Sequence, residues 1–237
     1  MHEQIEKETL HRVISSGNSE LDSRMGGGLP TGSLTLIEGS SGAGKSVLSQ
    51  QIVWGALQDG FKAALFTTEN TVKSLVPQMQ SIDLDILDFL LLGHLRIYPI
   101  ELSHLGQNAP SALIRALKTE RNCEVIIVDS FTSAAMYGAT DAQLLNFFEE
   151  CKRLCSRGIS IIVTIHADAF DSDVINPIRS MCDAHLKLFS EQDGQRLVKT
   201  LQVAKIRGAA SVTGAIFGFD VEPGWGLRVI PISKARG

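Results

Sequence analysis

The stretch EGSSGAGKSVLSQ, Glu38–Gln50, decides the fold because it carries the pattern G-x-x-x-x-G-K-S from Gly39 to Ser46. In this pattern a glycine-rich turn joins a buried strand to a helix, and its backbone N–H groups surround the β-phosphate of a nucleoside triphosphate. The required context is present, because the apolar run LTLIEG precedes the turn and an amphipathic stretch follows it. The sequence therefore predicts a phosphate-binding loop.

The residue types of this loop have separate roles in such a site. Gly42 and Gly44 allow unusual backbone angles and a close approach of the phosphates, Lys45 reaches the β- and γ-phosphates, and the Ser46 hydroxyl ligates Mg²⁺. The expected cofactors are accordingly ATP and Mg²⁺. The residues expected to bind the nucleotide here are Gly39, Ser40, Ser41, Gly42, Ala43, Gly44, Lys45, Ser46 and Val47.

Around the loop, short apolar runs alternate with helix-like stretches. Apolar runs without polar alternation, separated by helices, indicate a parallel sheet covered on both faces. From His185 onward, strand-like segments follow one another with tight turns, which predicts an antiparallel meander. The expected fold class is therefore α/β, with a mainly parallel central sheet flanked by helices and a C-terminal antiparallel β meander. The strands expected in the parallel part are 34–39, 63–69, 95–100, 124–130 and 160–166, and the helices are 46–59, 72–82, 111–118 and 142–157.

Length and composition favour one ordinary globular domain. The chain has 237 residues, 44% of them apolar, and a net charge of −4. We expect a polar lead-in over residues 1–15 and a single domain over 16–237. No basic excess is present to neutralise phosphates, so direct nucleic-acid binding is not expected. The start MHEQIEKETLHR has no apolar core, which argues against a signal peptide, and the apolar runs are too short to span a membrane.

The four cysteines indicate a reduced, cytosolic protein rather than a disulfide framework. They show no C-x-x-C spacing and have no His partners. Cys151 and Cys155 are four residues apart on a predicted helix, so they share a face that could clip a metal ion. Packing of small apolar side chains is the favoured interpretation.

The run VIIVDS places Asp129 at the carboxyl end of a predicted strand, where ligands bind in open α/β sheets. An Asp there can hold Mg²⁺ together with Ser46, as in Walker B sites. The alternative is an Asp that only caps a turn. Ser130 and Phe131 follow it, so the position next to Asp129 offers no acid to activate water.

Three further side chains end neighbouring strands and are expected at the same edge of the sheet. Glu69 is the candidate base that orients water for attack on the γ-phosphate, although a solvated strand-end Glu is the alternative. Thr164 and His166, in the run TIH, are expected to close the edge and sense the γ-phosphate. For His166 a packed or solvent-facing ring is the competing interpretation.

Longer segments resemble a known family. LDSRMGGGLPTGSLTLIEGSSGAGKS is similar to the entry segment of RecA/KaiC-type ATPases, as are a Glu after the second strand and a Walker B run ending in Asp-Ser. The resemblance extends from about Ser16 to the C-terminus. Within the family, FTTENTVKSLVPQM, LRIYP, TIHADAFD and FDVEPGWGLRVIPIS resemble the KaiC-like ATP-binding proteins of the archaellum, the archaeal motility motor.

This resemblance implies a RecA/KaiC-like fold and a homo-oligomer, expected to be a hexameric ring with ATP between subunits. A Lys-x-Arg of one subunit then reaches the γ-phosphate of the next, and here Lys205 and Arg207 match it. Alternate residues of a strand point the same way. Asn70 stands where KaiC-type domains often carry a second Glu, which implies slow hydrolysis. The implied partners are the archaellum motor ATPase and its membrane and ring components, through which the protein would lie at the cytoplasmic face of the membrane.

Two other functions stay open on the sequence. A RecA/RadB-like DNA recombination ATPase would need basic or flexible loops after the Walker B and TIH strands, but MYGATDAQ and HADAFDSDVINP are acidic to neutral. A KaiC-like signalling ATPase that phosphorylates itself is the third candidate, because Ser and Thr are plentiful.

Overall fold

The strand that leads into the phosphate loop, β3 (Leu34–Gly39), lies in the middle of the sheet. The structure, a computed structural model, describes residues 13–193, 196–208 and 212–230. All six residues of β3 are buried, and the strand pairs in parallel with β7 (Ser160–His166) and β8 (Ala184–Asp193). A strand with neighbours on both edges and helices on both faces has no side that favours polar residues, which explains the lack of alternation in LTLIEG.

On either side of these three strands the sheet continues differently. Beyond β7 the strands stay parallel, and beyond β8 they are antiparallel. Over the described residues the order is β11-β10-β9-β8-β3-β7-β6-β4-β5. The mainly parallel sheet with an antiparallel C-terminal meander confirms the fold class expected from the sequence. The added strands are β4 (Ala63–Thr67), β5 (Leu95–Pro99), β6 (Val125–Asp129), β9 (Arg196–Ile206), β10 (Ile216–Glu222) and β11 (Gly226–Ile230).

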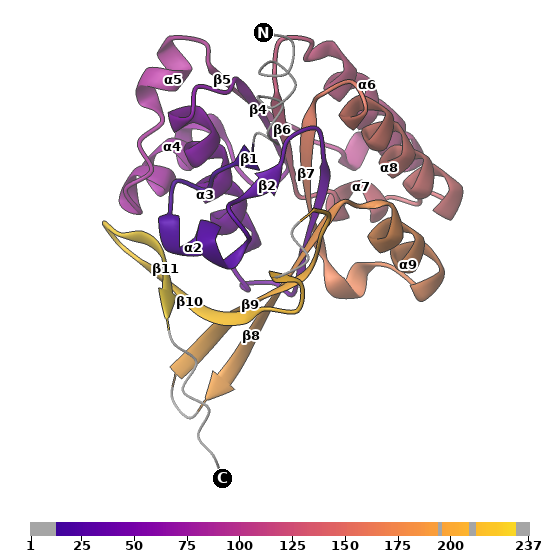
Figure 1. The fold of residues 1–237 in the computed structure, drawn as a ribbon. Helices are drawn as coiled ribbons and strands as arrows, with labels where there is room; N and C mark the ends of the chain where they lie inside the picture. The colour runs from indigo at the N-terminus through magenta and orange to yellow at the C-terminus, as the bar shows by residue number, and fades with distance from the viewer. Residues whose placement is uncertain (1–12, 194–195, 209–211, 231–237) are drawn as a thin grey trace, which may run out of the picture.

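Helices cover both faces of the sheet (Figure 1). One group packs with one face of the strands into a first hydrophobic core, and the other group packs with the opposite face into a second. No helix in the described ranges is long and apolar enough to cross a membrane. The first group is α2 (Ser19–Arg24), α3 (Lys45–Gln58), α4 (Val72–Ser81) and α5 (Leu87–Leu91), and the second is α6 (Ala109–Thr119), α7 (Thr132–Ala135), α8 (Asp141–Cys155) and α9 (Ser172–Met181).

The main difference from the expected elements is α9, because no helix was expected between the strand 160–166 and the C-terminal meander. Its sequence begins with Ser and Asp residues and contains Pro177, and both features argue against a helix interior. Val174, Ile175 and Ile178 are nevertheless buried, at helical spacing, against the second core. Tertiary packing therefore outweighs local propensity here.

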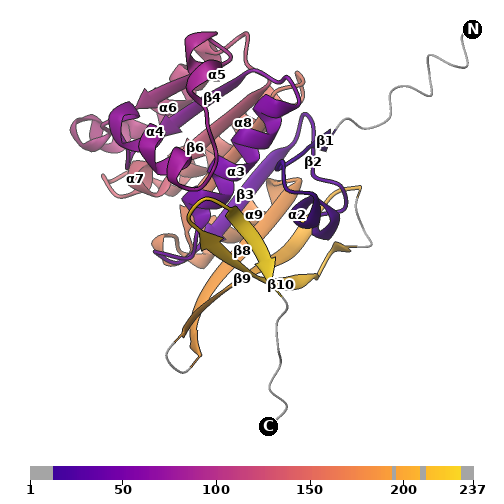
Figure 2. The same cartoon turned by 90° about the vertical axis from the view of Figure 1, so that its left-hand side faces the viewer.

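The N-terminal boundary also differs from expectation. Residues 1–12, most of the expected lead-in, lie outside the described residues. Val13–Ile14 forms strand β1, which pairs antiparallel with β2 (Leu29–Pro30), although it falls inside the expected lead-in. Figure 2 shows this pair beside α2, and the β8–β9 hairpin projecting from the rest of the sheet.

The segment after β1 packs closely on the middle of α3. The Gln51 amide donates to the Ser16 carbonyl over 2.8 Å, and Gly55 faces the backbone of Ser16 and Gly17. A Cβ atom on Gly55 would overlap both of these backbones. The close approach therefore requires glycine inside a helix, where it would otherwise be unfavourable.

We expect Gly55→Ala to destabilise the protein. Helix propensity alone predicts that the change raises the free energy of unfolding by about 1 kcal/mol, whereas the backbone overlap predicts a loss of about 1–3 kcal/mol. Urea denaturation followed by circular dichroism measures the sign directly. Gln58→Ala, at an exposed position of the same helix, serves as the near-neutral control, and a stabilised Gly55→Ala variant would contradict the packing described.

Candidate phosphate-binding site

The phosphate loop lies at the carboxyl end of β3, where α3 begins at Lys45. Gly44 is the N-cap of α3 with φ of 100°, a backbone angle that side chains with Cβ rarely adopt. A Cβ atom there would also come within 3.1 Å of the Phe219 ring on β10. The turn therefore needs glycine, and it leaves the backbone N–H groups at the start of α3 free to bind an anion.

Lys45 is buried within the loop that it serves. Its ammonium donates to the Ser40 carbonyl over 2.8 Å. Burial lowers the pKa of Lys45, while the nearby carboxylates of Glu69 and Asp129 act to raise it. The side chain is therefore placed between the loop backbone and the two carboxylates predicted to take part in the chemistry.

Asp129 binds two hydroxyl groups through the same carboxylate oxygen. Ser46 donates to Asp129 Oδ1 over 3.3 Å, and Thr164 donates to it over 2.6 Å. Burial raises the pKa of Asp129, and these two hydrogen bonds oppose that rise. Thr164, which is predicted to sense the γ-phosphate, is fully buried, and its hydroxyl group helps to fix the position of Asp129.

The Ser46–Asp129 pair fits Mg²⁺ by its chemistry. A hydroxyl and a carboxylate are hard oxygen ligands, and Mg²⁺ usually takes one or two protein ligands while phosphates and waters complete its octahedron. Within the described residues, no group of three or more His, Cys, Asp or Glu side chains could hold a metal by itself. The residues present therefore suit a metal ion that arrives with a nucleotide.

Glu69 and His166 line one pocket with the loop. The pocket has a volume of about 250 Å³ and includes Lys45, Ser46 and Lys199. Thr67 at the end of β4 accepts from the backbone N–H of Glu69 over 3.3 Å, which fixes the turn that carries this glutamate. Glu69 itself is exposed to solvent. Burial, followed by the Lys45 charge, lowers the pKa of His166, which favours the neutral form of its ring.

Lys199 is the pocket residue that sequence reasoning missed. It lies on β9 opposite Phe219 of β10, and Phe219 packs against Gly44. Only the strand register brings Lys199 to the phosphate loop, and its local sequence carries no motif. Its ammonium adds a positive charge beside the predicted phosphate position.

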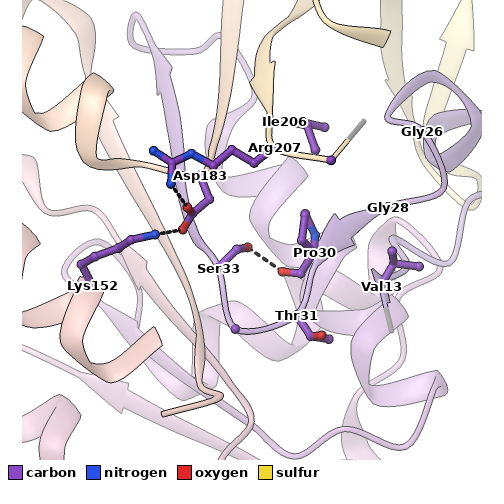
Figure 3. Close-up of a pocket in the computed structure, with 12 residues that line it drawn as sticks. Val13, Gly26, Gly28, Pro30, Thr31, Ser33, Lys152, Asp183, Ile206 and Arg207 are labelled. Carbon is purple, nitrogen blue, oxygen red and sulfur yellow. Dashed lines mark hydrogen bonds and ion pairs between the residues drawn. The ribbon is translucent and has the colours of Figure 1, made fainter. Parts of the chain in front are cut away.

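Lys205 and Arg207 lie away from the phosphate loop of their own chain. Lys205 Nζ donates to the Ser180 carbonyl over 3.1 Å, and Arg207 pairs with Asp183 at 3.1 Å. Asp183 precedes β8 and hydrogen-bonds to Leu34 at the start of β3, so this group lies at the amino-terminal edge of the parallel strands. Figure 3 shows Arg207 and Lys152 pointing toward Asp183 in a pocket of about 560 Å³.

A buried carboxylate immediately precedes the loop. Glu38 is 4% exposed and its carboxylate lies 2.8 Å from His185 Nε2, and Arg179 Nε donates to it over 2.9 Å. Burial alone would raise the pKa of Glu38, but the hydrogen bonds from His185 and Arg179 lower it to about 2. The sequence signal that could have revealed this ion pair is the charged Glu38 inside the apolar run LTLIEG, because a buried charge needs a partner.

The four cysteines are packed in the second hydrophobic core. Cys123, Cys151, Cys155 and Cys182 are free and buried. Burial raises the pKa of the Cys155 and Cys182 thiols to about 12, so both are protonated at neutral pH. The favoured interpretation, packed apolar side chains, is confirmed.

Comparisons with known proteins agree with this geometry. A family model described as "ATPase: KaiC" matches residues 14–234. The archaeal flagellar ATP-binding protein FlaH of Sulfolobus acidocaldarius is 36% identical over 229 residues, which covers 94% of this chain and 99% of the relative. These two matches confirm the family resemblance expected from the sequence.

Solved structures show the same fold. The crystal structure of the flagellar accessory protein FlaH from Methanocaldococcus jannaschii superposes with a TM-score of 0.77 at 26% identity, covering 93% of this chain and 99% of that one. A KaiC-like protein from Pyrococcus horikoshii superposes with a TM-score of 0.75, covering 93% of this chain and 100% of that one, at 21% identity.

The Glu38 pair predicts a pH dependence of stability. Because its pKa falls from an ordinary 4.5 to about 2 on folding, the charged carboxylate stabilises the native state by about 3 kcal/mol above pH 5, and this is lost as the pH falls toward 2. We therefore expect Glu38→Gln to lower the free energy of unfolding at pH 6, and the difference from wild type to shrink by pH 3. Denaturant titrations across this range measure it, with exposed Glu149→Gln as the control. A pH-independent difference would refute the assignment.

Proposed function

The chain belongs to the KaiC family of ATPases, and on that premise we propose that it is an ATP-binding, ring-forming subunit of the archaellum motor with slow hydrolysis of its own. The observation that carries this proposal is the separation of two half-sites. The phosphate loop and Asp129 lie at the carboxyl ends of the parallel strands. Lys205 and Arg207 lie at the opposite side, near the amino ends of these strands. The similarity to FlaH over 94% of the chain supports the role in the motor.

ATP binding rests on the loop and its neighbours. The backbone N–H groups at the start of α3 bind the phosphates, and Lys45 and Lys199 neutralise their charge. Ser46 and Asp129 would hold Mg²⁺, which neutralises charge on the β- and γ-phosphate oxygens when it is bound. His166 lines the same pocket and would serve as a hydrogen-bonding group for the γ-phosphate.

Slow hydrolysis follows from the surroundings of the candidate base. Glu69 can orient a water for in-line attack, but in the single chain its carboxylate is exposed, where bulk water competes for it. Ser130 and Phe131, which follow Asp129 directly, are buried and not acidic. ATP would then serve mainly to order the ring and to dock it to its partners.

A ring follows from a head-to-tail contact that brings the two half-sites of neighbouring subunits together. Such a heterologous contact closes into a ring when its rotation permits, and the expected ring is a hexamer. Residues 16–237 would form the single domain of each subunit. The partners would be the motor ATPase and the membrane and ring components of the archaellum, through which the protein reaches the membrane. Similarity to FlaH over nearly the whole chain favours this role over DNA recombination or self-phosphorylation.

We expect Glu69→Gln to keep ATP binding and to remove the slow hydrolysis, because the amide cannot take a proton from water. Nucleotide binding by fluorescence and phosphate release measure the two effects. Lys45→Ala is the reference for lost binding, since it removes the charge that holds the β- and γ-phosphates. Unchanged phosphate release by Glu69→Gln would exclude Glu69 as the base.

We expect Arg207→Ala to abolish the increase in mass that Mg-ATP induces, while each chain still binds ATP. The reason is that Arg207 is far from its own phosphate loop but available to a neighbour. Native mass spectrometry with and without Mg-ATP tests this. Arg153→Ala, which removes a similarly exposed and ion-paired arginine from α8, is the matched control. Normal assembly by Arg207→Ala would exclude its role between subunits.

A further inference from the structure

One segment of the chain contacts both half-sites. The residues from Arg179 to His185, called here the joining segment, lead from the end of α9 into β8. They hold β3, which carries the phosphate loop, and they are themselves held by Lys205 and Arg207. A continuous set of contacts therefore runs from Lys205 and Arg207, near the amino ends of the parallel strands, to the phosphate loop at their carboxyl ends.

On its inner side the joining segment fixes both ends of β3. Arg179 and His185 bind the buried Glu38 carboxylate, which directly precedes Gly39 of the phosphate loop. Asp183 binds the other end, because its carboxylate accepts from the Leu34 N–H over 3.0 Å and its own N–H donates to the Leu34 carbonyl over 2.8 Å. A displacement of the joining segment therefore moves the strand that carries the loop.

On its outer side the joining segment is held by the two cations of the Lys-x-Arg pair. Lys205 Nζ donates to the Ser180 carbonyl over 3.1 Å and to the Arg179 carbonyl over 3.5 Å, at the carboxyl end of α9, where a cation is favourable. Arg207 pairs with the Asp183 carboxylate and its N–H donates to the Asp183 carbonyl over 2.9 Å. Asp183 keeps a second cation, Lys152, if Arg207 leaves.

These contacts make the Lys-x-Arg pair bifunctional. Lys205 Nζ lies against the carbonyl groups at the end of α9 and Arg207 lies on the Asp183 carboxylate, so a neighbour's triphosphate would compete with the joining segment for these two cations. We propose that the joining segment couples the two half-sites of one subunit: when Lys205 and Arg207 engage the neighbour's triphosphate, the segment is released and Arg179 passes the change through Glu38 to the phosphate loop. The coupling rests on the proposed function for the source of that triphosphate, and Arg179 acts in it as a positioning residue.

The direction of the effect follows from which contacts are lost. With Lys205 on the joining segment, Glu38 and the loop are held in place for ATP. Once Lys205 leaves, its own subunit binds ATP less tightly, so adjacent sites of the ring oppose each other's filling. By linkage, ATP in a subunit's own site keeps its Lys205 on the joining segment.

The test uses the full chain without nucleotide, where no neighbour can supply a triphosphate. Hydrogen–deuterium exchange is measured in wild type, Lys205→Gln and Arg179→Gln. We expect faster exchange over residues 34–46 in both variants and unchanged exchange over β6, which separates coupling from general loss of stability. Lys118→Gln, an exposed ion-paired lysine of α6, and Arg115→Gln, an exposed arginine of the same helix, are the matched controls.

The affinity for ATP provides the second readout. It is measured with a fluorescent ATP analogue at a protein concentration where mass measurement shows monomers. We expect Lys205→Gln and Arg179→Gln to bind about fivefold or more weakly, the lower end of coupling effects between sites, and Arg179→Lys to recover part of the loss. Recovery by lysine indicates that the positive charge paired with Glu38 carries the effect.

The outcomes separate the coupling from the ring. Unchanged exchange over residues 34–46 in Lys205→Gln, together with unchanged ATP affinity, overturns the coupling even where Mg-ATP still assembles the chain. Assembly that does not respond to Arg207→Ala overturns the ring contact instead, and leaves faster exchange in Lys205→Gln as support for the connection within one chain.

Discussion

A buried, ionised carboxylate constrains the centre of this molecule. Glu38 is 4% exposed inside a strand whose other residues are also buried, and an unpaired charge in such a place would cost several kcal/mol. Its two partners, Arg179 and His185, come from α9 and β8, far along the chain. The strand, the helix and the returning strand must therefore form together, and the phosphate loop begins at the next residue.

The other side chains of the phosphate site also depend on neighbouring elements for their positions. Asp129 is held by Thr164 of β7 and Ser46 of α3, and the turn that presents Glu69 is fixed by Thr67 of β4. Parallel strands end at one edge, so short polar side chains at their ends meet without long loops. The arrangement of these side chains is thus set by strand register. The carboxyl ends of the strands can therefore present oxygen ligands and charges at fixed positions before a nucleotide arrives.

The sequence predicted the elements around the loop well because two independent signals coincide there. The strand Leu34–Gly39 has its expected bounds, and α3 begins within one residue of the expected start, since an apolar run, a glycine pattern and a helix follow each other. The helix α9 was missed because Pro177 and a polar start hide its buried face. Thr164 was predicted at the carboxyl ends of the strands, where it lies. Its contact with Asp129, however, depends on the pairing of strands, which its local sequence does not reveal.

The remaining contacts could not be predicted for the same physical reason. Arg179 reaches Glu38 across 141 residues of sequence, and Lys199 reaches the loop only through the pairing of β9 with β10. No local pattern encodes such contacts, because the partner is chosen by register and helix packing. Motifs therefore locate the atoms that meet the phosphates, while the residues that connect those atoms to the rest of the subunit come from the tertiary structure.

In the proposed ring, the placement of the phosphate loop and of the Lys-x-Arg pair at opposite ends of the parallel strands would have a consequence for how ATP acts. A ligand that contacts two subunits stabilises their contact by an amount that grows with its concentration relative to its dissociation constant. Fast hydrolysis would remove that stabilisation soon after assembly, whereas the slow hydrolysis proposed from the exposed Glu69 and from the buried, non-acidic Ser130 and Phe131 would preserve it. In the proposed ring, a slow site would report that ATP is present, and the connection from Lys205 through the joining segment to Glu38 would give each subunit a physical means to register the state of its neighbour.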